Sequence, residues 1–196
     1  MRTSFHRYSS SLLAAAFSFV LSACAADQTA AASGPESVSP AVASALPAPG
    51  PDGKIHLSED EWRSRLTPEQ YHILRASGTE RACSGAYWRT DGKQGVYVCG
   101  ACGLELFDSS SKFDSGTGWP SFTGPISPDR IINREDTSYG MIRTENLCFR
   151  CESHLGHSFP DGPPPTGIRY CMNSLALRFV PRGDAAVAPS ATDAAK

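Results

Sequence analysis

Two Cys-x-x-Cys pairs constrain the fold of this chain more than any other feature of its sequence. The first pair is Cys99 and Cys102, and the second is Cys148 and Cys151. Each pair places two thiols at one turn, a spacing that lets both sulfur atoms bind one tetrahedral ion. Together they supply the ligands of a structural zinc site, which leaves no open position for a substrate. Two disulfides, or one pair acting as a redox dithiol, are the alternatives.

The two pairs are 45 residues apart in the sequence. This separation exceeds that of a compact zinc ribbon. A shared ion would therefore join two separate hairpins of a larger domain. Losing the ion would then remove folding free energy directly.

The N-terminus has the three parts of an export signal. Arg2 and Arg7 precede an apolar run over residues 12–21, which is too short to span a bilayer and is followed by small residues. We therefore predict a signal peptide at residues 1–23, after which the chain would lie in a compartment that permits disulfides.

Cys24 follows this signal directly. The sequence Leu-Ser-Ala-Cys at residues 21–24 resembles the lipobox of bacterial lipoproteins, in which the cysteine becomes the acylated first residue. That resemblance implies an exported lipoprotein, anchored in a membrane and facing the periplasm. Ala25, where sorted lipoproteins can carry Asp, favours the outer membrane. A simple secretory signal in which Cys24 has no role is the alternative.

Composition divides the rest of the chain into three parts. Residues 24–53 and 182–196 are rich in small residues and proline, which predicts a flexible tether and a disordered tail. Residues 54–181 are enough for one domain with a real core, expected to be a monomer. After removal of the signal, 16 Lys and Arg face 20 Asp and Glu, a net charge of −4, and this balance gives no sign of nucleic-acid binding.

Local patterns predict two short helices followed by short strands. Ser58 and Thr67 each begin a helix with a capping pattern, and Gly78 is the predicted end of the second. Strand patterns lie between turn residues at 95–98, 131–132, 141–144 and 169–179. This order predicts a mainly antiparallel β domain with an N-terminal helical flank. It is not a βαβ layout, which argues against a thioredoxin-type use of either cysteine pair.

Cys171 belongs to neither pair and is a candidate nucleophile. On a strand, Arg169, Cys171 and Asn173 share one face. A guanidinium near a thiol favours the thiolate, which is the reactive form. Burial as a small apolar residue is the alternative for a cysteine of this kind.

Three aromatic or imidazole side chains add to this candidate site. Trp119 lies in a glycine-rich turn before a proline, where its indole could face a methyl-bearing sulfur group or pack in the core. His154 and His157 follow the second cysteine pair. With four cysteines available for the metal, these imidazoles are candidates for acid catalysis beside a thiol.

Three segments resemble the signature sequences of the methionine sulfoxide reductase B family. They are Gly-Thr-Gly-Trp-Pro-Ser-Phe at 116–122, His-Leu-Gly-His-Ser-Phe at 154–159 and Arg-Tyr-Cys-Met-Asn-Ser at 169–174. The two cysteine pairs resemble those of the family's zinc-binding form. The resemblance extends over about residues 57–180 in one consistent order.

The resemblance implies reduction of the R epimer of methionine sulfoxide, free or within oxidised proteins, to methionine. It also implies two antiparallel sheets in a β-tent-like arrangement with short N-terminal helices. Attack by the nucleophile would take up the oxygen as a sulfenic acid and release methionine. By this resemblance the nucleophile is Cys171, the groups around the sulfoxide oxygen are His154, His157 and Asn173, the group favouring the thiolate is Arg169, and the substrate-binding aromatics are Trp119 and Phe159.

The sequence departs from the family pattern in one place. Many members carry a recycling cysteine where this chain has Thr117. Cys83 is the remaining thiol, and we predict that it resolves the sulfenic acid as a disulfide, which a thioredoxin-like donor would reduce. A buried apolar role for Cys83 is the alternative. No glycine fingerprint for a nucleotide or flavin is present, so electrons would arrive by thiol exchange.

Two other classes of protein fit part of this pattern. One is a non-enzymatic zinc-ribbon lipoprotein that binds a partner and buries Cys171. The other is a thiol–disulfide oxidoreductase that uses a Cys-x-x-Cys pair. Metal and thiol counts separate these classes: zinc with two free thiols supports the reductase, whereas no zinc and a reactive Cys-x-x-Cys pair supports the oxidoreductase.

Overall fold

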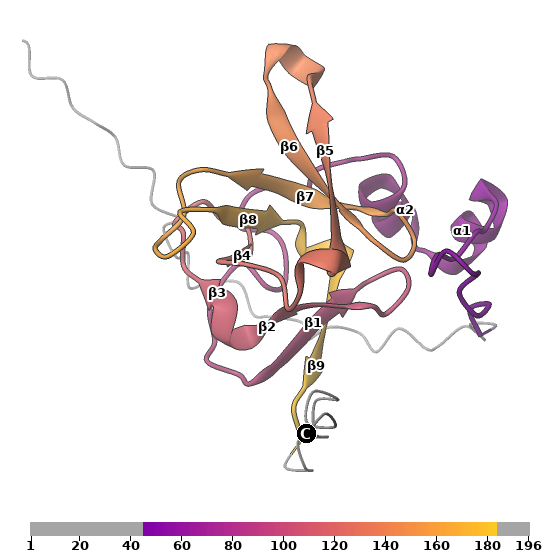
Figure 1. The fold of residues 1–196 in the computed structure, drawn as a ribbon, viewed down its shortest axis with the longest axis horizontal. Helices are drawn as coiled ribbons and strands as arrows, with labels where there is room; N and C mark the ends of the chain where they lie inside the picture. The colour runs from indigo at the N-terminus through magenta and orange to yellow at the C-terminus, as the bar shows by residue number, and fades with distance from the viewer. Residues whose placement is uncertain (1–44, 184–196) are drawn as a thin grey trace, which may run out of the picture. The chain divides into compact units, whose positions relative to one another are not determined.

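The computed structural model describes residues 45–183, which form two short α-helices and two antiparallel sheets (Figure 1). This confirms the predicted mainly β fold with two antiparallel sheets and short N-terminal helices. The signal peptide, Cys24 and most of the predicted tether and tail lie outside the described residues. Within residues 45–183, no helix combines the length and apolarity needed to cross a membrane.

The helices begin where their capping residues predict. α1 spans Glu59–Arg65 after the N-cap Ser58, and α2 spans Pro68–Leu74 after the N-cap Thr67. Both N-caps form complete capping boxes, in which the N-cap side chain and the N3 side chain satisfy each other's backbone N–H groups. α2 ends at Leu74, before the predicted Gly78.

The smaller sheet has three strands in the order β2-β1-β9. They are β1 (Gly95–Cys99), β2 (Glu105–Asp108) and β9 (Leu177–Pro181). β1 pairs with both neighbours in antiparallel register, and its hairpin with β2 contains the first cysteine pair. Sequence patterns predicted β1 but not β2.

The larger sheet has six strands in the order β3-β4-β8-β7-β6-β5. Their bounds are β3 (Lys112–Phe113), β4 (Ser121–Phe122), β5 (Ile131–Asp136), β6 (Arg143–Cys148), β7 (His154–Phe159) and β8 (Arg169–Met172). All its described pairings are antiparallel. β7 and β8 lie side by side in the centre and carry the candidate catalytic residues.

The predicted strand over 169–179 is two strands in different sheets. β8 ends at Met172, a 3-10 helix (η4) follows at Ser174–Ala176, and β9 begins at Leu177. The chain thus passes from the larger sheet to the smaller one within four residues. The sequence does not reveal this break, because the sheet that each half joins depends on pairing with distant strands.

Aromatic rings fill the space between the sheets. Phe107 of β2 stacks on Phe122 of β4 with ring centroids 4.3 Å apart, and Tyr97 of β1 meets Phe122 edge-on at 5.1 Å. Trp62 of α1 and Leu74 of α2 are each only 1% exposed and belong to the same core. The helices therefore pack on the core that joins the two sheets.

Candidate functional site

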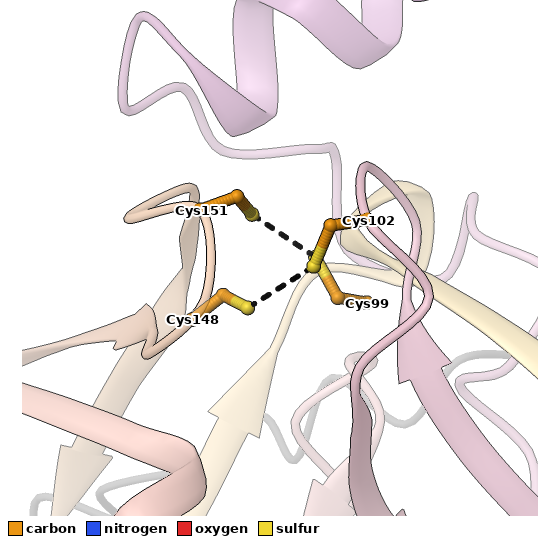
Figure 2. Close-up of side chains that lie close together, drawn as sticks. All are labelled: Cys99, Cys102, Cys148 and Cys151. Carbon is orange, nitrogen blue, oxygen red and sulfur yellow. Dashed lines mark hydrogen bonds between the residues drawn. The ribbon is translucent and has the colours of Figure 1, made fainter. Parts of the chain in front are cut away.

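The four paired cysteines meet at one point between the sheets (Figure 2). Their sulfur atoms all lie within 4.8 Å of one another, and the Sγ atoms of Cys99 and Cys151 are 3.7 Å apart. Those of Cys102 and Cys148 are 3.6 Å apart. Four sulfurs at about 2.3 Å from a tetrahedral zinc ion would be about 3.8 Å from one another. The observed spacing fits a four-cysteine metal site.

The chemistry of this cluster also favours a cation. All four cysteines are buried and none of them forms a disulfide. Hydrogen bonds with other thiols of the cluster, that of Cys102 first and that of Cys151 among them, raise the pKa of Cys99 and Cys148, and burial raises it further. Four thiolates cannot share such a space without a positive charge to balance them. These cysteines could therefore hold a metal ion, and their burial disfavours exchange with an external thiol.

The cluster joins two hairpins from different sheets, as the long spacing predicted. Cys99 ends β1 and Cys148 ends β6, and each partner lies in the turn that follows. The N-terminal flank is tied to the second turn, because Ile55 N–H donates to the Arg150 carbonyl at 2.7 Å. β7 starts three residues after Cys151, so the cysteine cluster also sets the start of the strand that carries His154 and His157.

Cys171 lies at a cavity of about 170 Å³ on the larger sheet. It is partly exposed and a free thiol, in contrast to the buried apolar role that sequence left open. Strand pairing sets His157 of β7 and Ser121 of β4 directly opposite it on either side. The cavity is lined by Thr79, Trp119, Arg143, Gly156, His157, Phe159, Cys171, Met172 and Asn173.

Burial and polar contacts act on Cys171 in opposite directions. Burial raises the pKa of the Cys171 thiol, and this effect outweighs the Arg169 charge and the contacts with the Thr117 and Ser121 hydroxyls, which lower it. Ser115 Oγ lies 2.9 Å from Thr117 Oγ1 and 2.8 Å from Ser121 Oγ, so the hydroxyls form one network. Sequence analysis named Thr117 only as the residue in place of a recycling cysteine, and it did not single out Ser121.

Arg169 lies near Cys171 but is held mainly by another residue. Its Nε and Nη2 atoms donate to the two carboxylate oxygens of Asp161, each at 2.9 Å. Its guanidinium also lies over the Phe159 ring, 4.6 Å from the centroid. The loop after β7 thus fixes the cation that faces the thiol.

The two histidines lie in different surroundings. His157 lines the Cys171 cavity, and its Nε2 atom is 2.8 Å from Asp136 Oδ2. His154 is 2% exposed, with Nδ1 2.7 Å from Glu145 Oε1, and burial lowers its pKa. It faces a neighbouring polar cavity of about 640 Å³, which also includes His157. The structure therefore places His157 in the Cys171 cavity, whereas His154 lies in the neighbouring cavity and does not line that of Cys171.

Each histidine is supported by a carboxylate that an arginine holds. Arg134 donates to Glu145 Oε2 through Nε at 2.9 Å and Nη2 at 2.7 Å. Arg143 donates to Asp136, whose pKa lies well below its usual range mainly because of hydrogen bonds from Ser138. Sequence analysis missed these supports, because all four residues look like ordinary surface charges of a hairpin.

Gly156 allows β7 and β8 to approach each other at the site. A Cβ atom at this position would lie 2.1 Å from the Cys171 carbonyl oxygen, a backbone atom that cannot move aside. Any other residue would separate the strands that carry His157 and Cys171. The glycine in the His-Leu-Gly-His sequence therefore has a steric purpose.

Cys83 lies beside the tryptophan turn. Its N–H donates to the Gly118 carbonyl at 2.8 Å, and a Cβ atom on Gly118 would lie 2.8 Å from its sulfur. Cys83 is partly exposed and is not part of the hydrophobic core. It does not line the Cys171 cavity, but Thr117, the neighbour of Gly118, contacts Cys171.

Comparison with known proteins agrees with this geometry. Residues 66–181 match the SelR domain family. The chain belongs to the SelR domain family. This match covers more than half of the chain and includes the whole Cys171 cavity and all four clustered cysteines.

Several similar proteins have one name in common. A peptide methionine sulfoxide reductase MsrB from Thiobacillus denitrificans is 58% identical over 125 residues, 64% of this chain and 94% of the relative. One from Pseudomonas putida is 57% identical over 129 residues, 66% of this chain and 98% of the relative. One from Methanosarcina barkeri is 60% identical over 125 residues, which cover 64% of this chain and 87% of the relative.

Removing a cluster ligand should release a metal ion and unfold the domain. If the four cysteines bind a metal ion, we expect Cys148→Ser to contain less metal than wild type and to lose more than about 4 kcal/mol of stability, since a structural metal contributes folding free energy. Elemental analysis and urea unfolding under reducing conditions measure both effects. Cys83→Ser is the matched control and should keep its metal. Equal metal content in Cys148→Ser and wild type would contradict a four-cysteine site.

The rate at which Cys171 is alkylated should keep rising with pH above the pH at which an ordinary cysteine is already fully ionised. Burial raises its pKa, so the thiolate forms at higher pH than usual. Thr117→Val removes a hydroxyl that favours the thiolate and should slow alkylation of Cys171 several-fold at neutral pH. Mass spectrometry of the Cys171 peptide after timed iodoacetamide treatment measures this rate. Thr90→Val, at an exposed position outside both cavities, should leave it unchanged; equal rates in all three proteins would refute the assignment.

Proposed function

We propose that this protein reduces the R epimer of methionine sulfoxide, free or within proteins, to methionine. The observation that carries the proposal is one cavity in which a partly exposed thiol, an aromatic wall and polar donors converge. The names of the SelR relatives, which describe peptide methionine sulfoxide reductases, support the same reaction.

The cavity has an apolar and a polar side for such a substrate. Trp119 and Phe159 provide aromatic surface for the methyl group, since sulfur and its substituents contact aromatic rings favourably. His157 and Asn173 provide hydrogen-bond donors for the sulfoxide oxygen. A sulfoxide sulfur is pyramidal, so the fixed positions of the methyl group and the oxygen, together with the fixed direction from which Cys171 approaches the sulfur, admit one epimer.

The reduction transfers the sulfoxide oxygen to the enzyme. The Cys171 thiolate attacks, a proton is taken up, and the sulfur–oxygen bond of the substrate breaks as the oxygen becomes bound to Cys171 Sγ. Methionine sulfur gains two electrons and Cys171 loses two, becoming a sulfenic acid. Burial that disfavours the free thiolate also strengthens its reaction with a bound, polarised substrate.

His157 is the proposed source of the proton. Its Nε2 atom is held by Asp136, which leaves Nδ1 as the nitrogen that can exchange a proton with the substrate. His154 completes the set as a buried imidazole fixed by Glu145. An acid is needed here because a sulfoxide oxygen leaves only when protonated.

Cys83 is the proposed resolving thiol. In its thiol form it attacks the sulfenic acid, giving a Cys83–Cys171 disulfide and one molecule of water. Its position against Gly118, next to the Thr117 that contacts Cys171, supports this role. A thioredoxin-like dithiol would then reduce the disulfide by exchange.

The remaining elements of the proposal concern the metal and the cellular location. Zinc is the ion proposed for the four-cysteine cluster, because zinc takes a closed tetrahedral sulfur shell in structural sites. The export signal and the lipobox sequence ending at Cys24 support a lipoprotein anchored in a membrane and facing the periplasm.

The geometry disfavours both rival classes. A thiol–disulfide oxidoreductase needs an accessible Cys-x-x-Cys, whereas Cys99 and Cys148 are fully buried. A zinc-ribbon binding protein has no need for a partly exposed thiol in a cavity with imidazole and indole groups.

Turnover of separated epimers tests the proposed reaction. We expect wild type to release methionine from the R epimer and not from the S epimer, with dithiothreitol as reductant. Cys171→Ser should reduce the rate by at least about a thousandfold, since it removes the nucleophile. Cys83→Ser should retain activity in this assay, because dithiothreitol can act directly. Activity that survives Cys171→Ser would contradict the mechanism.

A single turnover without reductant tests the resolving role. We expect oxidised wild type to contain a Cys83–Cys171 disulfide, and Cys83→Ser to retain a sulfenic acid on Cys171 that dimedone traps. Both should release the same amount of methionine. The double variant Cys83→Ser/Thr117→Cys should regain a disulfide, because position 117 contacts Cys171. Peptide mass spectrometry measures each species; an oxidised wild type lacking the crosslink would mean that an external thiol attacks directly.

A further inference from the structure

Glu80 connects two side chains of the Cys171 cavity without lining the cavity itself. Its main-chain carbonyl accepts a hydrogen bond from Trp119 Nε1 at 3.0 Å. Its main-chain N–H donates to Asn173 Oδ1, also at 3.0 Å. Trp119 precedes β4 and Asn173 follows β8. One residue from a third segment, Glu80, therefore sets the distance between the two side chains.

The contact with Asn173 fixes which end of its amide can meet a substrate. A backbone N–H can only donate, so the atom that faces Glu80 must be Oδ1. Nδ2 donates to the Leu155 carbonyl at 3.2 Å and keeps a second hydrogen. The free hydrogen of Asn173 is therefore a donor, which suits a sulfoxide oxygen.

The carboxylate of Glu80 holds the backbone that follows Asn173. Glu80 is 9% exposed, and its two oxygens accept from Ser174 N–H at 2.6 Å and Leu175 N–H at 3.1 Å. These are the first two residues of η4, whose own N-cap Asn173 makes no side-chain capping bond. Glu80 thus caps η4 from outside and leaves the Asn173 side chain available to the cavity.

Gly85 shows how tightly this carboxylate is enclosed. A Cβ atom at position 85 would lie 2.6 Å from Glu80 Oε1 and 2.1 Å from Ser174 Oγ. The chain on the far side of the carboxylate therefore comes as close as a glycine allows. Gly85 therefore bounds the carboxylate on this side, and the hydrogen bonds from Ser174 and Leu175 hold it in place.

We propose that Glu80 is a positioning residue that sets the distance between the Trp119 wall and the Asn173 donor, and thereby the selection of a methyl sulfoxide. This inference rests on the proposed function. The backbone of Glu80 holds both groups, and its carboxylate holds the backbone in place. Loosening the carboxylate would widen the space for the sulfur substituent and misplace the donor for its oxygen.

Glu80→Gln tests this role because it keeps the size of the side chain. A carboxamide presents one acceptor and one NH₂ group, so one of the two N–H groups of η4 loses its partner. We expect kcat/KM for methionine sulfoxide to fall by up to about a hundredfold, as for a small displacement of reacting groups. The preference for methionine sulfoxide over ethionine sulfoxide, which carries one more methylene, should fall several-fold.

Asp108→Asn is the matched control. Asp108 caps the 3-10 helix η1 (Ser109–Ser111) by accepting from Ser110 N–H at 2.9 Å, and it lines neither cavity near Cys171. This variant should lose stability while keeping the methyl-to-ethyl preference of wild type. Glu80→Asp keeps the charge but shortens the side chain, so its preference should fall between those of wild type and Glu80→Gln. If Glu80→Gln does not fold, Glu80→Asp provides the test in its place.

The outcomes separate this inference from the proposed function. If wild type reduces neither sulfoxide, the proposed function fails. If wild type shows no preference for the methyl compound, or if both Glu80 variants keep the wild-type preference, the positioning role is wrong while the reductase function stands. A matching loss of preference in Asp108→Asn would also overturn it, because the effect would then follow general stability.

Discussion

The four-sulfur cluster is the constraint on which the rest of the structure depends. It joins the β1–β2 hairpin of one sheet to the β6–β7 hairpin of the other. Gly100, within the first pair, donates to the Ala176 carbonyl of η4 at 2.8 Å, and β7 begins just after Cys151. The same cluster therefore fixes both the strand that carries His157 and the segment that follows Asn173.

In the candidate site, burial and polar neighbours shift the pKa of Cys171 in opposite directions. Burial raises the pKa of Cys171, while the Arg169 guanidinium and two hydroxyls lower it. Each histidine in turn depends on a carboxylate held by an arginine of the β5–β6 hairpin. A partly buried thiol with prearranged polar neighbours is able to react with a bound substrate without extensive reorganisation of solvent.

Short-range patterns predicted the parts of the fold that have short-range causes. Both helix starts follow from the capping boxes of Ser58 and Thr67, and both metal-ligand turns from two-residue spacing. The break between β8 and β9 could not be predicted in this way, because it depends on which sheet each half joins. β7 was missed as a strand, since Gly156 weakens its pattern and is required only by the nearby Cys171 backbone.

The sequence by itself determined the chemistry that this chain can offer: four cysteines in two chelating pairs, a further thiol at Cys171, and imidazole and indole groups in recognisable segments. Only the tertiary structure decided how these groups are arranged and supported. It placed His157 rather than His154 beside Cys171, and it made Glu80 the link between Trp119 and Asn173. The physical reason is that chelation and capping act over a few residues, whereas hydrogen bonds between distant segments depend on the packing of the whole domain.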